Sequence, residues 1–357
     1  LASVTGPWGL DLLICLFNLA LAQHLSSRSR GNRRALIATC AIAACVCVYG
    51  FGTTIIKYEP GPRTAVLQGN MKNDFHPVPN YTEIAFSTFS RMTRDAASEG
   101  AKLVIWPETT IPCDITSPGW VDRIGALARD CSVEILAGGY DPANNSGQPG
   151  SYNTLFLFDK QGRMAGAYHK VQLVPFGEFV PLRERLPMLR DYGIRNEDVV
   201  AAKSHRLLKT SAGKVGVSIC FESLFPQIAR SEVLRGAQIL CVVTNDAWFQ
   251  RTQAAREHLM MAQLRAIENR RYLFRAAGTG ISAVIDPCGG IRQRCDLFRQ
   301  GIIYDQARLS DGLTVYTRFG DWFVYLCIAI LIASLPALWH GPLSPSDAKH
   351  PPENGPG

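Results

Sequence analysis

The chain has 357 residues, which is enough for one large α/β domain with smaller additions. Hydrophobic residues reach 47% and charged residues only 19%, an apolar excess that indicates membrane-spanning segments in addition to a core. The net charge of +7 would suit nucleic acid, but no zinc-finger spacing or base-stacking aromatic pattern accompanies it, so we predict no nucleic-acid partner.

Two apolar runs near the N-terminus predict membrane helices. The first, Trp8–Ala22, is interrupted by only two polar residues, and the second, Ala35–Ile56, has no charged residue over 22 positions and is long enough to cross a bilayer. Between them lies the densest basic cluster of the chain, Arg28, Arg30, Arg33 and Arg34. Because basic loops stay cytoplasmic, this cluster places the chain after Ile56 on the opposite face of the membrane.

A third apolar run, Trp322–Trp339, has tryptophan at both ends, as interfacial belts do, and would return the chain to the cytoplasm. The chain starts at Leu1 without a methionine or a basic n-region, which indicates a truncated N-terminus rather than a signal peptide. We therefore predict four parts: two transmembrane helices with a basic cytoplasmic loop (1–57), a catalytic domain (58–317), a C-terminal transmembrane helix (318–340) and a disordered, Pro-rich cytoplasmic tail (341–357).

Strands and helices alternate in the middle of the chain, which predicts an α/β fold with both sheet faces covered. The expected strands are Arg63–Gln68, Lys102–Trp106, Val133–Gly138, Asn153–Asp159, Gly162–Tyr168, Lys214–Ile219, Ala237–Thr244, Tyr272–Ala277, Ile281–Asp286, Ile302–Gln306 and Leu313–Tyr316. The expected helices are Asn80–Glu99, Val121–Arg129, Phe221–Leu234 and Gln253–Asn269.

Three residues with reactive side chains follow directly on predicted strands: Glu108, Lys170 and Cys220. Ligands of α/β sheets collect at the carboxyl ends of strands, so the fold can bring these residues together although they lie 62 and 50 positions apart. Taken singly, each has an ordinary alternative. A thiol packs as a small hydrophobe, an acid after a strand is often a solvated loop residue, and a lysine usually lies on the surface.

Together, a carboxylate, an ammonium and a thiol can perform acyl transfer. Glu108 would take the thiol proton as general base, Cys220 would attack a carbonyl, and Lys170 would stabilise the oxyanion. Cys220 lies between a strand and a predicted helix, where the amide groups of a helix N-terminus favour the thiolate.

The remaining cysteines predict no disulfide framework, because five lie in apolar runs and five others remain outside them once Cys220 is set aside. Cys288 and Cys295 flank a Gly-Gly turn and are candidates for a hairpin disulfide. Their C-x6-C spacing does not match a zinc site, and no H-E-x-x-H motif occurs. We predict no metal and no cofactor.

Several motifs resemble the nitrilase superfamily, and more closely its membrane-embedded branch, apolipoprotein N-acyltransferase. They are LVIWPETTIP (Leu103–Pro112), YHKVQLVPFGEFVPL (Tyr168–Leu182), SICFESLFP (Ser218–Pro226), TNDAWF (Thr244–Phe249), HLMMAQLRAIENRR (His258–Arg271) and RFGDWF (Arg318–Phe323). These six blocks stand in the order of the family and extend the resemblance over nearly the whole chain.

The resemblance implies a four-layer α-β-β-α sandwich on the periplasmic face of a bacterial inner membrane. It places the Glu-Lys-Cys triad of the family on Glu108, Lys170 and Cys220. The second essential glutamate falls on Glu178, which would orient Lys170 or complete proton transfer, and the acid after the nucleophile falls on Glu222.

The resemblance also places a loop near the site at Trp248 and Phe249, for which simple core packing is an equally good interpretation. Phe221 stands where the family commonly has tyrosine, and the lost hydroxyl predicts modulation by about 1 kcal/mol rather than inactivity. Gln250 replaces a more usual glycine, and the family carries further membrane spans upstream of Trp8.

The function implied is transfer of an acyl chain from a phospholipid, through a cysteine thioester, to the α-amine of a diacylglyceryl-cysteine apolipoprotein. The expected partners are therefore a phospholipid donor, a diacylated apolipoprotein acceptor and the membrane. Two alternatives stay open: a membrane-tethered hydrolase of carbon-nitrogen bonds that uses the same triad, and a catalytically inactive scaffold that binds lipoproteins.

Overall fold

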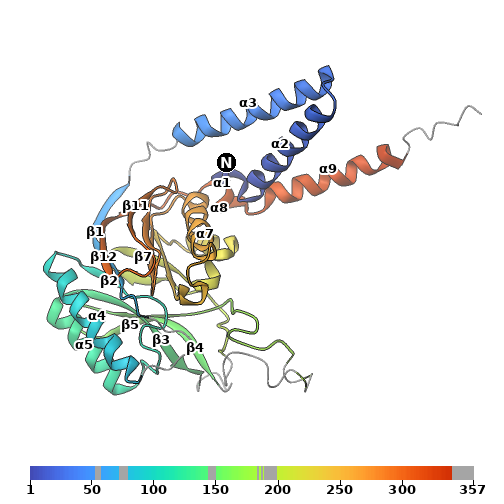
Figure 1. Ribbon diagram of the computed structural model, residues 1–357. Helices are drawn as coiled ribbons and strands as arrows, with labels where there is room; N and C mark the ends of the chain where they lie inside the picture. The colour runs from blue at the N-terminus through green and yellow to red at the C-terminus, as the bar shows by residue number, and fades with distance from the viewer. Residues whose placement is uncertain are drawn as a thin grey trace, which may run out of the picture.

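The computed structural model describes residues 1–52, 58–71, 79–143, 150–182, 185, 188 and 199–339. The predicted tail at 341–357 lies outside these residues. In the described part the α/β body is built on two six-stranded sheets, and three long apolar helices project from it on one side (Figure 1).

The first sheet has the strand order β12-β1-β2-β3-β4-β5. Its strands are β1 (Glu59–Gln68), β2 (Leu103–Ile105), β3 (Glu134–Pro142), β4 (Ser151–Phe158), β5 (Met164–His169) and β12 (Gly301–Leu309). The pairs β1–β2 and β2–β3 are parallel, and their crossover helices are α4 (Tyr81–Ser98) and α5 (Pro118–Cys131). Both helices cover the outer face of this sheet (Figure 1).

The second sheet has the order β11-β10-β9-β8-β7-β6. Its strands are β6 (Leu208–Thr210), β7 (Gly213–Ile219), β8 (Ile239–Thr244), β9 (Leu273–Ala277), β10 (Ser282–Ile285) and β11 (Ile291–Cys295). The parallel pairs β7–β8 and β8–β9 are connected through α6 (Pro226–Leu234) and α7 (Ala254–Asn269), which pack on the outer face of this sheet.

Three layers of apolar side chains hold this sandwich together. Residues such as Leu136 and Val217 fill the space between the sheets, Phe89 and Ile135 join the first sheet to its helices, and Leu259 joins α7 to the second sheet. Each interface removes side chains of both partners from water, which is the main stabilising term for such a fold. The predicted four-layer α-β-β-α architecture is therefore confirmed.

Some predicted elements are wrong in detail. Leu313–Tyr316 is not a strand, because the hydroxyl of Thr314 accepts a hydrogen bond from the Thr317 amide at 2.9 Å and begins the short helix α8 (Val315–Phe319). The helix predicted over Phe221–Leu234 is divided into a 3₁₀-helix, η4 (Cys220–Leu224), and α6, which starts at Pro226. A proline fits the first turn of a helix but not its interior.

The structure differs from the sequence predictions in two further respects at the β10–β11 hairpin. Strand β11 is not among the predicted strands, because its exposed sequence IRQRC lacks the apolar alternation of a half-buried strand. Cys288 and Cys295 are free thiols. Cys288 lies in the turn, whereas Cys295 lies at the far end of β11 opposite Ser282, so the two residues do not face each other across the hairpin.

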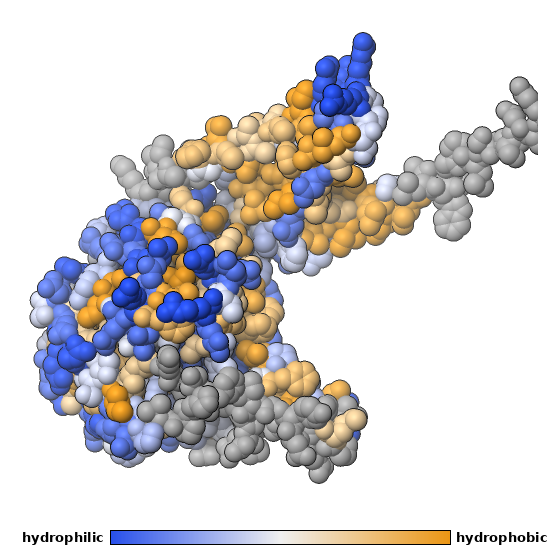
Figure 2. Space-filling view, viewed as in Figure 1, coloured by the Kyte–Doolittle hydropathy of each residue, from blue (hydrophilic) through white to orange (hydrophobic). Residues whose placement is uncertain are grey.

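At the N-terminus, α1 (Ala2–Thr5) is followed by α2 (Trp8–Ser26) and α3 (Arg30–Gly52), and the last helix is α9 (Trp322–Trp339). Within the described residues α2 and α3 are long and apolar enough to cross a membrane, whereas the described apolar stretch of α9, Trp322–Leu335, is shorter. The third span therefore stays a prediction. Only 11% of α2 and 6% of α3 is buried against protein, and Figure 2 shows their apolar surfaces exposed, as contact with lipid would require.

Two tryptophans join the first and last apolar helices at the surface of the α/β body. The indole of Trp8 donates to Asp321 Oδ1 at 2.9 Å, and the indole of Trp322 donates to the Val4 carbonyl at 2.8 Å. These hydrogen bonds fix the ends of α2 and α9 side by side, next to α8 and the body of the domain (Figure 1).

Candidate active site

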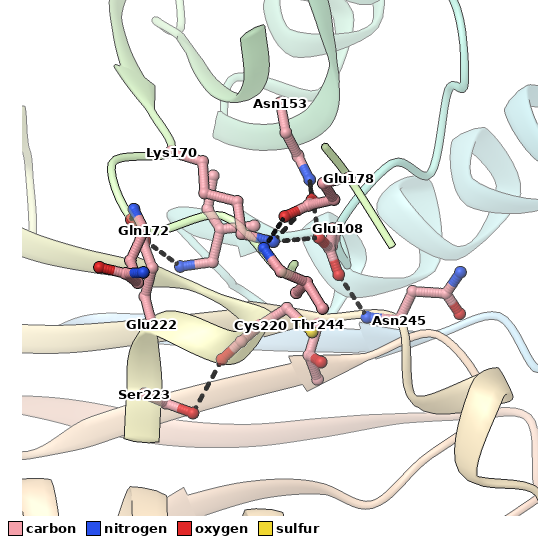
Figure 3. Close-up of polar contacts among 12 residues, drawn as sticks. Glu108, Asn153, Lys170, Gln172, Glu178, Cys220, Glu222, Ser223, Thr244 and Asn245 are labelled. Atoms are coloured by element: carbon pink, nitrogen blue, oxygen red, sulfur yellow. Dashed lines mark hydrogen bonds and ion pairs between the residues drawn. The ribbon is translucent and has the colours of Figure 1, made fainter. Parts of the chain in front are cut away.

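The structure brings Glu108, Lys170 and Cys220 together at the carboxyl ends of the strands, where the two sheets meet (Figure 3). Glu108 comes from the loop after β2, Lys170 directly follows β5, and Cys220 directly follows β7. Figure 3 shows the three side chains pointing toward one another. Glu108 and Lys170 are almost completely buried, so neither is a solvated loop acid or a surface lysine.

Lys170 is held between two carboxylates. Its Nζ lies 2.8 Å from Glu178 Oε1 and 3.4 Å from Glu108 Oε1. Burial alone would lower the pKa of Lys170, but the negative charges around it, first of all that of Glu108, raise the pKa above its ordinary value. Lys170 is therefore a permanent cation in a site from which water is largely excluded.

Backbone and amide donors fix the carboxylates as well. Asn153 Nδ2 donates to Glu108 Oε1 at 2.8 Å and to Glu178 Oε1 at 3.1 Å. The backbone N–H group of Asn245 donates to Glu108 Oε2 at 2.8 Å. Every oxygen of Glu108 is thus engaged, which keeps the carboxylate in one orientation beside Cys220.

Cys220 has a left-handed backbone, with φ of 53°, at the turn between β7 and η4. Burial raises the pKa of its thiol, and the charge of Glu108 raises it further, whereas Lys170 and the Thr244 hydroxyl act in the opposite direction. The expectation that a helix N-terminus favours the thiolate is wrong, because α6 begins only at Pro226. The pKa of the thiol is therefore raised rather than lowered, and Figure 3 shows the Glu108 carboxylate beside it.

Glu222 connects the cysteine turn to the lysine loop. Its Oε1 accepts from the amides of Val171 at 2.6 Å and Gln172 at 3.0 Å, and its Oε2 accepts from Ile219 N at 2.7 Å and Tyr168 Oη at 3.0 Å. The carboxylate is completely buried and ties the residues next to Lys170 to the residue before Cys220. Glu222 therefore helps to set the distance between Lys170 and Cys220.

The other candidates lie at the edge of this site. Phe221 is half-buried and packs edge-on against Phe225 with ring centroids 5.1 Å apart. Phe249 is half-buried against His258, whereas 47% of Trp248 is exposed, so core packing does not account for Trp248. The roles of these residues in binding substrate stay predictions.

Sequence reasoning missed Asn153 and Asn245 as parts of the site. Asn153 is the third residue of β4, and the sequence pattern predicts it only as the start of an ordinary strand. The signal that could have found it is a polar side chain in a strand that is otherwise buried, because such a group needs a hydrogen-bond partner inside the protein.

Comparisons with known proteins agree with this geometry. The model of the carbon-nitrogen hydrolase family matches residues 63–312. The chain belongs to the carbon-nitrogen hydrolase family. In fold, the structure is similar to Nit3 of Saccharomyces cerevisiae, a member of branch 10 of the nitrilase superfamily. The TM-score is 0.56 at 19% sequence identity, and the superposition covers 70% of this chain and 91% of that chain.

Among its sequence relatives, this carbon-nitrogen hydrolase family member is 32% identical over 339 residues to the apolipoprotein N-acyltransferase of Geobacter metallireducens, an alignment covering 92% of this chain and 65% of the relative. It is 33% identical over 329 residues to the apolipoprotein N-acyltransferase of Gloeobacter violaceus, covering 90% of this chain and 62% of the relative. The chain thus spans somewhat less than two thirds of the length of these curated relatives.

Gly138 in β3 tests how tightly the Glu108 loop is placed. A Cβ atom at Gly138 would lie 2.4 Å from the Pro107 carbonyl oxygen and 2.7 Å from the Thr109 amide nitrogen, and both are backbone atoms that cannot rotate away. Gly138→Ala should therefore displace Glu108 and slow iodoacetamide alkylation of Cys220 by about 100-fold, measured on the Cys220 peptide by mass spectrometry. Gly119→Ala, whose Cβ meets no atom within 4 Å, is the matched control. Equal rates in both variants would contradict a tightly placed base.

Glu222 offers a test by stability. Glu222→Ala leaves three backbone amides, one buried and two part-buried, without their acceptor, so the free energy of unfolding should fall by roughly 3 kcal/mol. Chemical unfolding in detergent measures the loss, and Glu257→Ala, which removes an exposed carboxylate from α7, should change it by less than about 0.5 kcal/mol. A small loss for Glu222→Ala would show that these hydrogen bonds do not hold the two loops together.

Proposed function

We propose that the protein is a phospholipid-dependent N-acyltransferase. It transfers a fatty acyl chain, through a thioester on Cys220, to the N-terminal α-amine of a diacylglyceryl-cysteine apolipoprotein. The observation that carries this proposal is the meeting of Cys220 with the buried Glu108 and Lys170 in a chain with exposed apolar helices. The names of the relatives at 32% and 33% identity support the same activity.

The proposed chemistry has two steps. Glu108 takes the thiol proton, the Cys220 sulfur attacks the ester carbonyl of the phospholipid, and the ammonium of Lys170 stabilises the oxyanion. Glu108 then gives this proton to the leaving oxygen, and the lysophospholipid departs as an alcohol. In the second step the α-amine of the acceptor attacks the thioester, Glu108 accepts the amine proton, and the Cys220 thiol is restored as the amide forms.

Exposed apolar side chains favour a lipid donor over a small polar amide. Phe176 and Leu182 are 51% and 56% exposed on the loop that carries Glu178, and Trp248 is 47% exposed on η5 (Asp246–Phe249), directly after Asn245. Leu224, at the end of η4, is 40% exposed. The loops that carry Glu178, Cys220 and Asn245 therefore also present an apolar group to the outside, as binding to acyl chains would require.

The location proposed is the inner membrane of a bacterium, with several membrane passes and the catalytic domain on the periplasmic side. The support is the basic segment Arg28–Arg34, which covers the α2–α3 junction and the start of α3 and should stay in the cytoplasm, leaving the domain after α3 on the other face. A site held at the bilayer surface meets acyl esters and lipidated amines at high effective concentration, which favours transfer over hydrolysis.

The deciding experiment incubates the detergent-solubilised protein with phospholipid and a diacylated lipopeptide and measures the mass of the peptide. The proposal expects a gain of one acyl chain. Release of free fatty acid with an unchanged peptide would support the hydrolase alternative, and binding of the lipopeptide without either product would support the scaffold.

Replacing the nucleophile tests the thioester. Cys220→Ala should abolish acyl transfer, and Cys220→Ser should leave only a small residue of activity, because a serine hydroxyl is a weaker nucleophile here than the thiol. Both are measured by the same mass assay, with Cys241→Ala as the control for loss of a buried thiol outside the site. Normal turnover by either Cys220 variant would overturn the mechanism.

Replacing the base tests the first step alone. Glu108→Gln keeps the shape of the side chain but cannot accept the thiol proton, so it should block formation of the acyl-enzyme. Intact-protein mass after incubation with phospholipid, in the absence of an acceptor, measures this step. Acyl-enzyme at the wild-type level in Glu108→Gln would contradict the assignment of Glu108 as the base.

A further inference from the structure

The left-handed turn at Cys220 is supported from below by a buried polar cluster. The Cys220 carbonyl accepts a hydrogen bond from Ser223 Oγ at 2.9 Å and lies 3.1 Å from His258 Nε2. A carbonyl oxygen can only accept, so the hydrogen bond to it forms with the proton on Nε2, the nitrogen that also lies 2.8 Å from Ser223 Oγ. His258 is 4% exposed and comes from α7, so a helix distant in sequence fixes the backbone of the nucleophile.

His258 is itself held by a buried ion pair. Its Nδ1 lies 3.0 Å from Asp246 Oδ1, and Asp246 Oδ2 pairs with the guanidinium of Arg275 on β9. The Arg275 charge is the main influence opposing burial, and it keeps the pKa of Asp246 below its ordinary value, so Asp246 stays ionised. Asp246 and Arg275 are both fully or almost fully buried, and their pairing is therefore costly to disturb.

The same carboxylate reaches the sulfur side of Cys220 through Thr244. The Thr244 hydroxyl donates to Asp246 Oδ1 at 2.7 Å, and it lies within hydrogen-bonding reach of the Cys220 sulfur (Figure 3). Asp246 thus supports the nucleophile by two routes: through His258 to the carbonyl, and through Thr244 to the sulfur.

We propose that Thr244, Asp246 and His258 are positioning residues for the nucleophile. His258 holds the left-handed turn of Cys220, and the Thr244 hydroxyl, kept in place by Asp246, stabilises the thiolate once Glu108 has taken the proton. The inference rests on Cys220 being the nucleophile of the proposed function, but not on the identity of the acyl donor.

The hydroxyl can do this because it has one proton and two lone pairs. While Cys220 is a thiol, the Thr244 hydroxyl donates its hydrogen bond to Asp246 and accepts one from the S–H group through a lone pair. Toward the thiolate it turns the proton to the sulfur, while Asp246 keeps its ion pair with Arg275. The charged groups that face the thiol are Glu108, Lys170 and Asp246. Thr244→Val leaves all three in place but removes the hydrogen bond from the Thr244 hydroxyl to Asp246.

The pH dependence of Cys220 alkylation tests the sulfur side. A hydrogen bond to a charged sulfur is stronger than one to the thiol, so Thr244→Val should raise the apparent pKa for iodoacetamide alkylation of Cys220 by about one pH unit. Thr244→Ser, which keeps the hydroxyl, should recover most of this shift. Thr93→Val removes a buried threonine hydroxyl that accepts from Trp106 Nε1 at 3.0 Å in another part of the domain, and it should lower thermal stability without moving the alkylation profile.

The carbonyl side is tested at His258. His258→Leu should slow alkylation about ten-fold at every pH and lower kcat for acyl transfer with little change in KM, whereas His258→Gln, whose amide can still donate to the Cys220 carbonyl, should recover most of the rate. The inference is overturned if Thr244→Val has the wild-type alkylation profile, or if folded His258→Leu alkylates at the wild-type rate. Alkylation needs no lipid, so absence of acyl transfer in the wild-type protein would reject the proposed function without deciding this inference.

Discussion

The site depends on one buried ammonium shared by two carboxylates. Lys170 has no access to bulk water, and its charge is compensated by Glu178 at 2.8 Å and by Glu108 at 3.4 Å. Removing one partner of such a group leaves a charge uncompensated in a medium of low dielectric constant, which is strongly destabilising. The same charges that make the site costly to build keep Lys170 protonated and Glu108 in a fixed orientation, as the proposed acyl transfer would require.

The two-sheet architecture explains how residues so far apart in the chain reach one point. β2, β5 and β7 each end at the interface of the sheets. Lys170 and Cys220, directly after β5 and β7, and Glu108, three residues after β2, therefore project into the same space. Glu222 and Asn245 then cross between the loops by hydrogen bonds to Val171 and Glu108. The apolar core between the sheets fixes the distance of these loops, and the polar crossings fix their register.

Much of this arrangement could be predicted from the sequence, for a physical reason. Buried strands such as Leu103–Ile105 and Ile239–Thr244 are continuous apolar runs, and reactive side chains directly after them are conspicuous. The resemblance of six motif blocks to the nitrilase superfamily predicts the four-layer sandwich. The family match over residues 63–312 and the two six-stranded sheets confirm this prediction.

Other features depend on contacts that no local pattern carries. The thiolate prediction at Cys220 failed because burial and Glu108 outweigh the field of a helix that begins only at Pro226. The helix at Val315–Phe319 replaced a predicted strand because a threonine cap decides the backbone of a short β-branched segment. No sequence pattern connects Asn153, Thr244 and His258, because each contacts partners that come from distant segments of the chain.

The most direct test of the account is the fate of the acyl chain on the enzyme. The wild-type protein is incubated with phospholipid and no acceptor, digested, and mapped by mass spectrometry before and after treatment with hydroxylamine. The account predicts one acyl chain on the Cys220 peptide, released by hydroxylamine as a thioester should be. Acyl transfer to a lipopeptide without an adduct at Cys220, or with the chain on another residue, would contradict it.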